Sequence, residues 1–145
     1  MTDIEVARRI VMDAFSESKL DVLDEVLTPD FVNHNAPPGV DRGIEGVKQI
    51  IAMERRGIPD MRCEILWEGQ DGNIVFQHVL VTGTHDGPLF GVQATGRPVR
   101  WREMHIAVMR DGRCAEHWGV TDMAGLWVQI GKAGPPVVDL QGTRA

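Results

Sequence analysis

The spacing of the apolar residues changes near residue 60, from a helical repeat to a two-fold repeat. Before this point, apolar residues recur every three or four positions in segments 3–15, 20–27 and 44–55, which predicts three amphipathic helices. From Met61 to Glu68, the residues Met, Cys, Ile and Trp occupy every second position. Such alternation is typical of a β-strand.

More strands and a closing helix are predicted after residue 70. The strands cover residues 74–85, 99–109 and 114–120, and the helix covers residues 123–130. Helices, then antiparallel strands, then a helix is an α+β order. We therefore expect an α+β fold, in which the N-terminal helices close a strongly curved antiparallel sheet into a cone, or α+β barrel, around an apolar pocket.

Short-range signals mark the ends of these elements. Thr2 and Glu5 have the spacing of a capping box before the first helix. Thr28-Pro29 ends the second helix, and Asp111-Gly112 predicts a hairpin between the last two strands. We expect a single domain over residues 1–134, followed by a Pro/Gly-rich tail over residues 135–145.

Composition and charge exclude several kinds of partner. The chain has 145 residues and a net charge of -6, with its basic residues dispersed, so nucleic acid is not an expected partner. No apolar run is long enough to cross a bilayer, and the acidic N-terminus does not resemble a signal peptide. These features predict a cytoplasmic protein without a membrane partner.

The two cysteines, Cys63 and Cys114, lie far apart in the sequence and without metal-ligand spacing. Reduced, partly buried thiols are the favoured interpretation. The sequence alone leaves a disulfide between them open.

Ionisable residues on the predicted strands are the candidates for chemistry. The sequence lacks a Gly-rich phosphate loop, a nucleophilic Ser elbow and the usual zinc motifs. The remaining candidates are His34, His78, His85, Glu103, His105, Glu116, His117 and Asp122.

The hairpin at Asp111-Gly112 decides which candidates share a face of the sheet. With a three-residue loop and Gly112 in a bulge, His105 lies opposite Gly119. The residues that then share one surface are Trp101, Glu103, His105 and His117.

A two-residue turn would shift this pairing by one position. His105 would then lie opposite Trp118, and Glu116 and Asp122 would join its surface. The sequence leaves both registers open.

Each candidate also has a purely structural interpretation. A buried histidine often makes one hydrogen bond in a core, and Asp122 directly precedes the last helix, where its carboxylate can cap the free amides. A functional role is favoured more strongly for His105 than for the other histidines, because Glu103 on the same face would tune its pKa.

The residues in three stretches resemble the SnoaL-like polyketide cyclases, within the ketosteroid-isomerase-like fold. The stretches are FVNHNAPPGVDRGIEGVKQI, VTGTHDGPLFGVQATGRPV and MHIAVMRDGRCAEHWGVTDMAGLWVQIG. The resemblance covers residues 3–131. It implies a hydrophobic pocket, a homodimer or higher homo-oligomer, and neither a metal nor an organic cofactor.

The resemblance also implies a departure at the acid–base position. In the cyclases, an aspartate on the last strand acts as acid and base in an aldol ring closure, assisted by a histidine on the preceding strand. His105 matches that histidine, but the aspartate falls on Gly119. The three-residue loop agrees with this match, since it places positions 105 and 119 opposite each other.

Three functions follow as hypotheses. The first is acid–base catalysis, such as ring closure or isomerisation of an aromatic polyketide or similar apolar molecule, in which His105 or His117 replaces the missing carboxylate. The second is a role in polyketide hydroxylation, and the third is binding of a hydrophobic ligand without catalysis. The expected catalytic residues are His105, His117, Glu103 and Asp122, and the expected substrate-binding residues are Trp101, His34, Phe90, His85 and Phe15.

Overall fold

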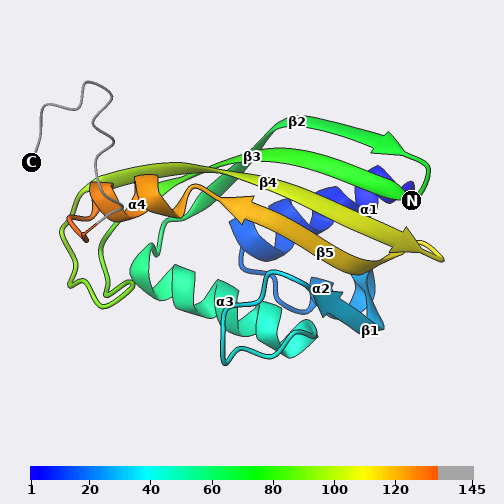
Figure 1. Cartoon of the computed structure of the whole chain (residues 1–145), viewed down its shortest axis with the longest axis horizontal. Coiled ribbons are helices and arrows are strands. Elements are labelled where there is room, and N and C mark those ends of the chain that lie inside the picture. Colours follow the sequence, from blue (N-terminus) through cyan, green and yellow to red (C-terminus); the bar gives the residue numbers. More distant parts are fainter. Residues whose placement is uncertain (134–145) are drawn as a thin grey trace, which may run out of the picture.

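The computed structural model of the chain describes residues 1–133, in which helices cover one face of a five-stranded curved sheet (Figure 1). The α+β class predicted from the sequence is confirmed. The predicted tail, residues 135–145, lies outside the described residues, and the division of the chain at residue 134 stays a prediction.

The helical segments agree closely with the apolar repeats. They are α1 (Asp3–Arg9), the π-helix η1 (Ile10–Ser16), α2 (Val22–Val26), α3 (Ile44–Gly57) and α4 (Met123–Gln129). The capping box is present, because the Glu5 N–H donates to Thr2 Oγ1 at 3.3 Å and the Thr2 N–H donates to Glu5 Oε2 at 2.6 Å. The first predicted helix is helical throughout, but its second half has π geometry, a form often found at functional sites.

The strands form one sheet in the order β1-β5-β4-β3-β2. They are β1 (Leu27–Asn33), β2 (Arg62–Asp71), β3 (Ile74–Thr84), β4 (Pro98–Arg110) and β5 (Arg113–Thr121). Two features differ from the prediction. The edge strand β1 runs parallel to β5, and the sheet stays open, with β1 and β2 as its edges, so the cone is not a closed barrel. Pro29 is tolerated in β1 because an edge strand has one side without ladder hydrogen bonds.

The β4–β5 hairpin combines features of both predicted registers. Asp111 and Gly112 have φ angles of 50° and 76°, as in a two-residue type I′ turn, and Arg110 pairs with Arg113. The register then shifts by one residue at Ala115, which is a β-bulge. His105 therefore lies opposite Gly119, so the predicted pairing is confirmed, although a bulge rather than a three-residue loop produces it.

The core lies between the sheet and the helices, and Arg55 of α3 ties its elements together. Its guanidinium group donates to the backbone oxygens of Phe15, Ser16 and Met61, at 2.6, 2.9 and 2.9 Å. These bonds satisfy carbonyl groups at the end of η1, which the helix itself leaves free. Arg55 thus joins η1, α3 and the start of β2 at one end of the interior.

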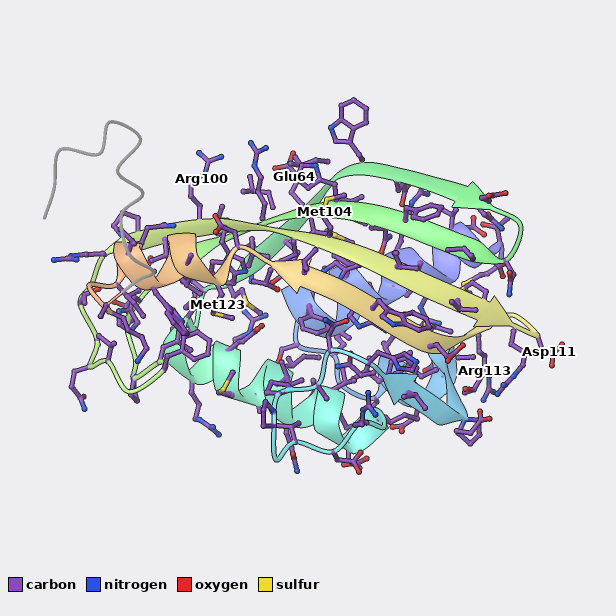
Figure 2. All side chains as sticks on the ribbon, viewed as in Figure 1. Glu64, Arg100, Met104, Asp111, Arg113 and Met123 are labelled. Atoms are coloured by element: carbon purple, nitrogen blue, oxygen red, sulfur yellow. The ribbon has the colours of Figure 1, made fainter. Side chains whose placement is uncertain are left out.

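The outer face of the sheet carries several large, exposed apolar side chains. Two cross-strand rows run over it: Trp118, Ile106 and Phe76 in one, and Val120, Met104, His78 and Trp67 in the other. Trp67 is 75% exposed and Val120 is 69% exposed. Figure 2 shows Met104 on this side, together with Glu64 and Arg100.

The start of α3 depends on a close backbone contact at Gly46. A Cβ atom at this position would lie 1.7 Å from the backbone oxygen of Asp41. We predict that Gly46→Ala destabilises the fold by more than about 2 kcal/mol, although alanine is the better helix former. Urea denaturation measures this. Gly69→Ala, where nothing lies within 4 Å of the added atom, is the control, and an equal effect of both substitutions would contradict the prediction.

Candidate active site

A cavity of about 220 Å³ lies between the inner face of the sheet and the helices η1 and α3. Most of its wall is apolar, with contributions from every layer of the fold. Representative residues are Phe15, Ile50, Met53, Val79, Phe90 and Ala107. Such a wall suits a largely hydrophobic small molecule, with orientation left to a few polar groups.

The polar groups on the sheet wall form one continuous hydrogen-bonded chain. Trp101 Nε1 donates to Glu103 Oε1 at 2.8 Å, and Glu103 Oε2 lies 2.8 Å from His105 Nε2. His105 Nδ1 lies 2.8 Å from His117 Nε2, and His117 Nδ1 lies 2.9 Å from Asn33 Oδ1. We call His105 and His117 the imidazole pair.

The pKa values of Glu103 and His117 in this hydrogen-bonded network are shifted for different reasons. Burial alone would raise the pKa of Glu103, but the hydrogen bond and charge of His105 and the hydrogen bond from Trp101 outweigh it, so the pKa lies below its usual value. Burial and the neighbouring His105 lower the pKa of His117 to about 3. Near neutral pH, Glu103 is therefore a carboxylate and His117 is a neutral imidazole.

The hydrogen-bond partners then locate the protons. The Asn35 N–H donates to Asn33 Oδ1 at 3.1 Å, so this atom is an oxygen and His117 Nδ1 must donate to it. A neutral His117 has one N–H, which makes its Nε2 an acceptor for His105 Nδ1. Because the Glu103 carboxylate only accepts, His105 Nε2 faces an acceptor as well. Both ring nitrogens of His105 thus have an acceptor within hydrogen-bond distance, so the network can hold an additional proton on this ring.

The absence of a side chain at Gly119 leaves room for the two rings of the imidazole pair. A Cβ atom at position 119 would lie 3.0 Å from His105 Nδ1, 3.0 Å from His117 Cε1 and 3.1 Å from His117 Nε2. The ring of His117 therefore lies where a side chain on residue 119 would begin. The Gly119 N–H donates to Asn35 Oδ1 at 2.5 Å, which holds the loop after β1 against β5.

A second carboxyl group, Glu54 of α3, also lines the cavity. Burial and the negative charge of Glu103 raise the pKa of Glu54 to about 8. Two carboxyl groups in one cavity thus have opposite protonation states near neutral pH. The cavity also contains the buried free thiols of Cys63 and Cys114, and burial raises the pKa of each to about 12, so both stay protonated.

Five of the nine predicted site residues line the cavity, namely Phe15, Phe90, Glu103, His105 and His117. Trp101 does not belong to the lining, and its indole N–H holds Glu103. In this structure Trp101 supports Glu103, and its predicted contact with a substrate stays a prediction.

Three other predicted site residues lie elsewhere. His34 stacks on Trp118 with 4.0 Å between ring centroids, outside the lining. His85 is fully buried, with Nδ1 2.9 Å from Thr95 Oγ1. Asp122, predicted as catalytic, caps α4 through a 2.9 Å bond from the Gly125 N–H to Oδ1.

Sequence reasoning missed Glu54 and Asn33. Glu54 lies seven residues after Val47, on the same helical stripe as the apolar residues of α3. A lone carboxyl group within an apolar stripe was the available signal. Asn33 gave no comparable signal, because its contact with His117 depends on the parallel pairing of β1 with β5.

Metal ligands and membrane spans were also sought in the described part of the chain. Within residues 1–133, no three His, Cys, Asp or Glu side chains come together in a way that would hold a metal ion. None of the helices described there has the length and apolar character that crossing a membrane requires.

The site is an apolar pocket beneath a curved sheet, with hydrogen-bonded histidines and carboxyl groups in its wall, an arrangement typical of sites for hydrophobic small molecules. The chain belongs to the SnoaL-like polyketide cyclase family, whose model matches residues 5–130. The resemblance found in the sequence is thereby confirmed.

Two relatives are cyclases by name. The chain is 25% identical over 127 residues to the nogalonic acid methyl ester cyclase of Streptomyces nogalater, a match that covers 86% of this chain and 95% of the relative. It is 26% identical over 141 residues to the aklanonic acid methyl ester cyclase DauD of Streptomyces sp. (strain C5), which covers 91% of this chain and 83% of the relative.

Solved structures show the same fold. TsrD from Streptomyces laurentii matches with a TM-score of 0.80 and 27% identity, over 89% of this chain and 94% of TsrD. AclR from Streptomyces galilaeus, described as a candidate hydroxylase, matches with a TM-score of 0.78 and 25% identity, over 89% of this chain and 95% of AclR.

The low pKa of His117 predicts a loss of stability in acid. As pH falls from roughly 6.5 toward 3, His117 becomes protonated in the unfolded chain but stays neutral in the folded chain. The free energy of unfolding is therefore highest above this pH range and decreases within it. The decrease is at most about 1.4 kcal/mol per pH unit. Urea denaturation between pH 7.5 and 4.5 should show a shallower decrease for His117→Asn than for the wild type.

His78→Asn, on the outer face of the sheet, is the control for this measurement and should follow the wild-type profile. A His117→Asn profile parallel to the wild type would contradict the prediction.

Proposed function

We propose that this protein is a polyketide cyclase that closes a ring by proton transfer, with the imidazole pair in place of the aspartate of the resembling cyclases. One observation carries the proposal: the His117 ring fills the space above Gly119 and makes a 2.8 Å hydrogen bond to His105. An aspartate at position 119 would direct its carboxylate into that same space.

The proton balance of an intramolecular aldol reaction fits one shared acid–base group. An acidic carbon loses a proton, its electron pair forms the new carbon–carbon bond at a carbonyl carbon, and the carbonyl oxygen gains a proton. The imidazole pair takes up the proton that the carbon loses and returns one to the carbonyl oxygen, so it ends the reaction in the state in which it began. The Glu103 carboxylate, 2.8 Å from His105 Nε2, stabilises the positive charge that His105 carries between these two transfers.

The relatives suggest the substrate class. Their names specify methyl esters of nogalonic and aklanonic acid, and the apolar lining of the cavity supports a similarly hydrophobic polyketide here. Protein groups then need to contact only the reacting oxygens and carbon, while the apolar wall excludes water.

Substitutions in the imidazole pair test the proposal. We predict that His105→Ala and His117→Ala each lower the rate of cyclisation at least about 100-fold, measured by chromatography with aklanonic and nogalonic acid methyl esters. Wild-type turnover retained in both variants would exclude proton transfer by the pair. A product one oxygen atom heavier would instead assign hydroxylation, the candidate function of AclR, and an unchanged ligand recovered after binding would assign a carrier.

Moving the acid–base group from position 117 to position 119 tests whether an aspartate can replace the imidazole of His117. Gly119→Asp alone should abolish turnover, because its Cβ would lie 3.0 Å from both imidazole rings. Combined with His117→Ala, the new carboxylate gains room to reach His105, and part of the activity lost in His117→Ala should return. A double variant no more active than His117→Ala would contradict the equivalence of the two arrangements.

We further propose that a second copy of the chain covers the exposed apolar rows of the outer face. Beside these rows, Arg102 of β4 and Glu64 of β2 lie in one cross-strand row with Leu80 between them. Both charged residues are exposed and neither forms an ion pair within residues 1–133. A two-fold axis through this row would place Arg102 of one copy over Glu64 of the other, as a self-complementary interface requires.

This assembly predicts a change in molecular mass on substitution. Met104→Glu should convert a dimer into a monomer, because a charge would be buried at the centre of the interface, and analytical ultracentrifugation measures the mass. Val128→Glu places the same charge on an exposed residue of α4 and should leave the dimer intact. A wild-type monomer at micromolar concentration would overturn the proposal.

A further inference from the structure

Glu54 is a polar residue on an otherwise apolar helical face. On α3 it follows Val47, Ile50 and Ile51 at helical spacing, and it lies in the lining of the cavity, on the wall opposite the sheet that carries the imidazole pair. Its carboxyl group forms no hydrogen bond within residues 1–133, yet its oxygens are not sealed from the cavity. An unpartnered polar group aimed into a binding cavity is available to a ligand.

The groups around Glu54 favour its uncharged form. Burial and the negative charge of Glu103 on β4 raise the pKa of Glu54, and they outweigh the positive charge of Arg55, which lowers it. The neighbouring Arg55 has its guanidinium directed to the backbone oxygens of Phe15, Ser16 and Met61. This cation therefore holds the fold together and does not pair with Glu54, so the carboxyl group keeps its proton in an apolar wall.

We propose that Glu54 binds the substrate as a neutral carboxylic acid, donating an O–H hydrogen bond to a carbonyl oxygen from the wall opposite the imidazole pair. This inference rests on the proposed function, since it names a second polar contact for the same substrate. A neutral donor attracts the oxygen more strongly as that oxygen gains negative charge in an enolate. The substrate would thus be held between an acidic donor on α3 and the proton-transferring pair on the sheet.

The protonation state is tested without substrate. With a folded pKa of about 8 against an ordinary value of 4.5, Glu54 contributes stability below pH 4.5 that is lost as pH rises through 8. Glu54→Gln keeps the shape and the neutrality but cannot ionise. The stability difference between this variant and the wild type should therefore move in favour of the variant between pH 5 and 9, and a constant difference would overturn the neutral-acid assignment.

Binding of a probe tests the contact itself. The probe is 9,10-anthraquinone, a planar apolar molecule with carbonyl oxygens and no group to cyclise, followed by tryptophan fluorescence. Glu54→Gln, which still has an N–H donor, should bind within about twofold of the wild type at pH 7, while Glu54→Leu should bind at least about fivefold more weakly. Equal affinity of the Leu variant and the wild type, or an equal loss in both variants, would overturn the proposal.

This experiment separates the inference from the proposed function. Failure of the Glu54 contact leaves the effects of His105→Ala and His117→Ala on turnover unchanged. Conversely, if those histidine variants keep full turnover, the probe still reports whether Glu54 donates a hydrogen bond.

Discussion

The extra residue in β5, Ala115, is the constraint on which the site depends. Side chains alternate between the two faces of a strand, so a shift of one residue exchanges the whole set. The bulge places His117 on the inner face beside His105, and it places Trp118 on the outer face opposite Ile106. The bulge therefore sets which side chains of β5 join the proton network and which join the exposed apolar surface.

The two carboxyl groups of the pocket differ in protonation because their neighbours differ. Glu103 receives hydrogen bonds from Trp101 and His105 and is ionised, whereas Glu54 has neither partner and stays protonated. This separation follows from solvation, since an apolar cavity tolerates a charge only where hydrogen bonds or an opposite charge compensate it. A cavity with one carboxylate, a pair of imidazoles and one neutral acid can take up one proton from a substrate and return another, so its net charge is the same before and after the reaction.

Local sequence patterns predicted the elements well, but contacts between distant segments less well. The helical and two-fold repeats gave the order of helices and strands, and Asp111-Gly112 gave the hairpin. The parallel pairing of β1 with β5 was not predicted, because it is set by tertiary packing, and with it the contact between Asn33 and His117 was missed. Five predicted site residues line the cavity, whereas Asp122 proved to be the cap that its position before α4 also allowed.

The central claim is that the imidazole pair moves the substrate's proton, and proton exchange at the substrate carbon measures this most directly. With aklanonic acid methyl ester in D₂O, mass spectrometry follows deuterium entering the acidic carbon before ring closure. The account predicts that the wild-type protein accelerates this exchange and that a variant with asparagine at both His105 and His117 does not. Equal exchange rates in the two proteins would contradict it.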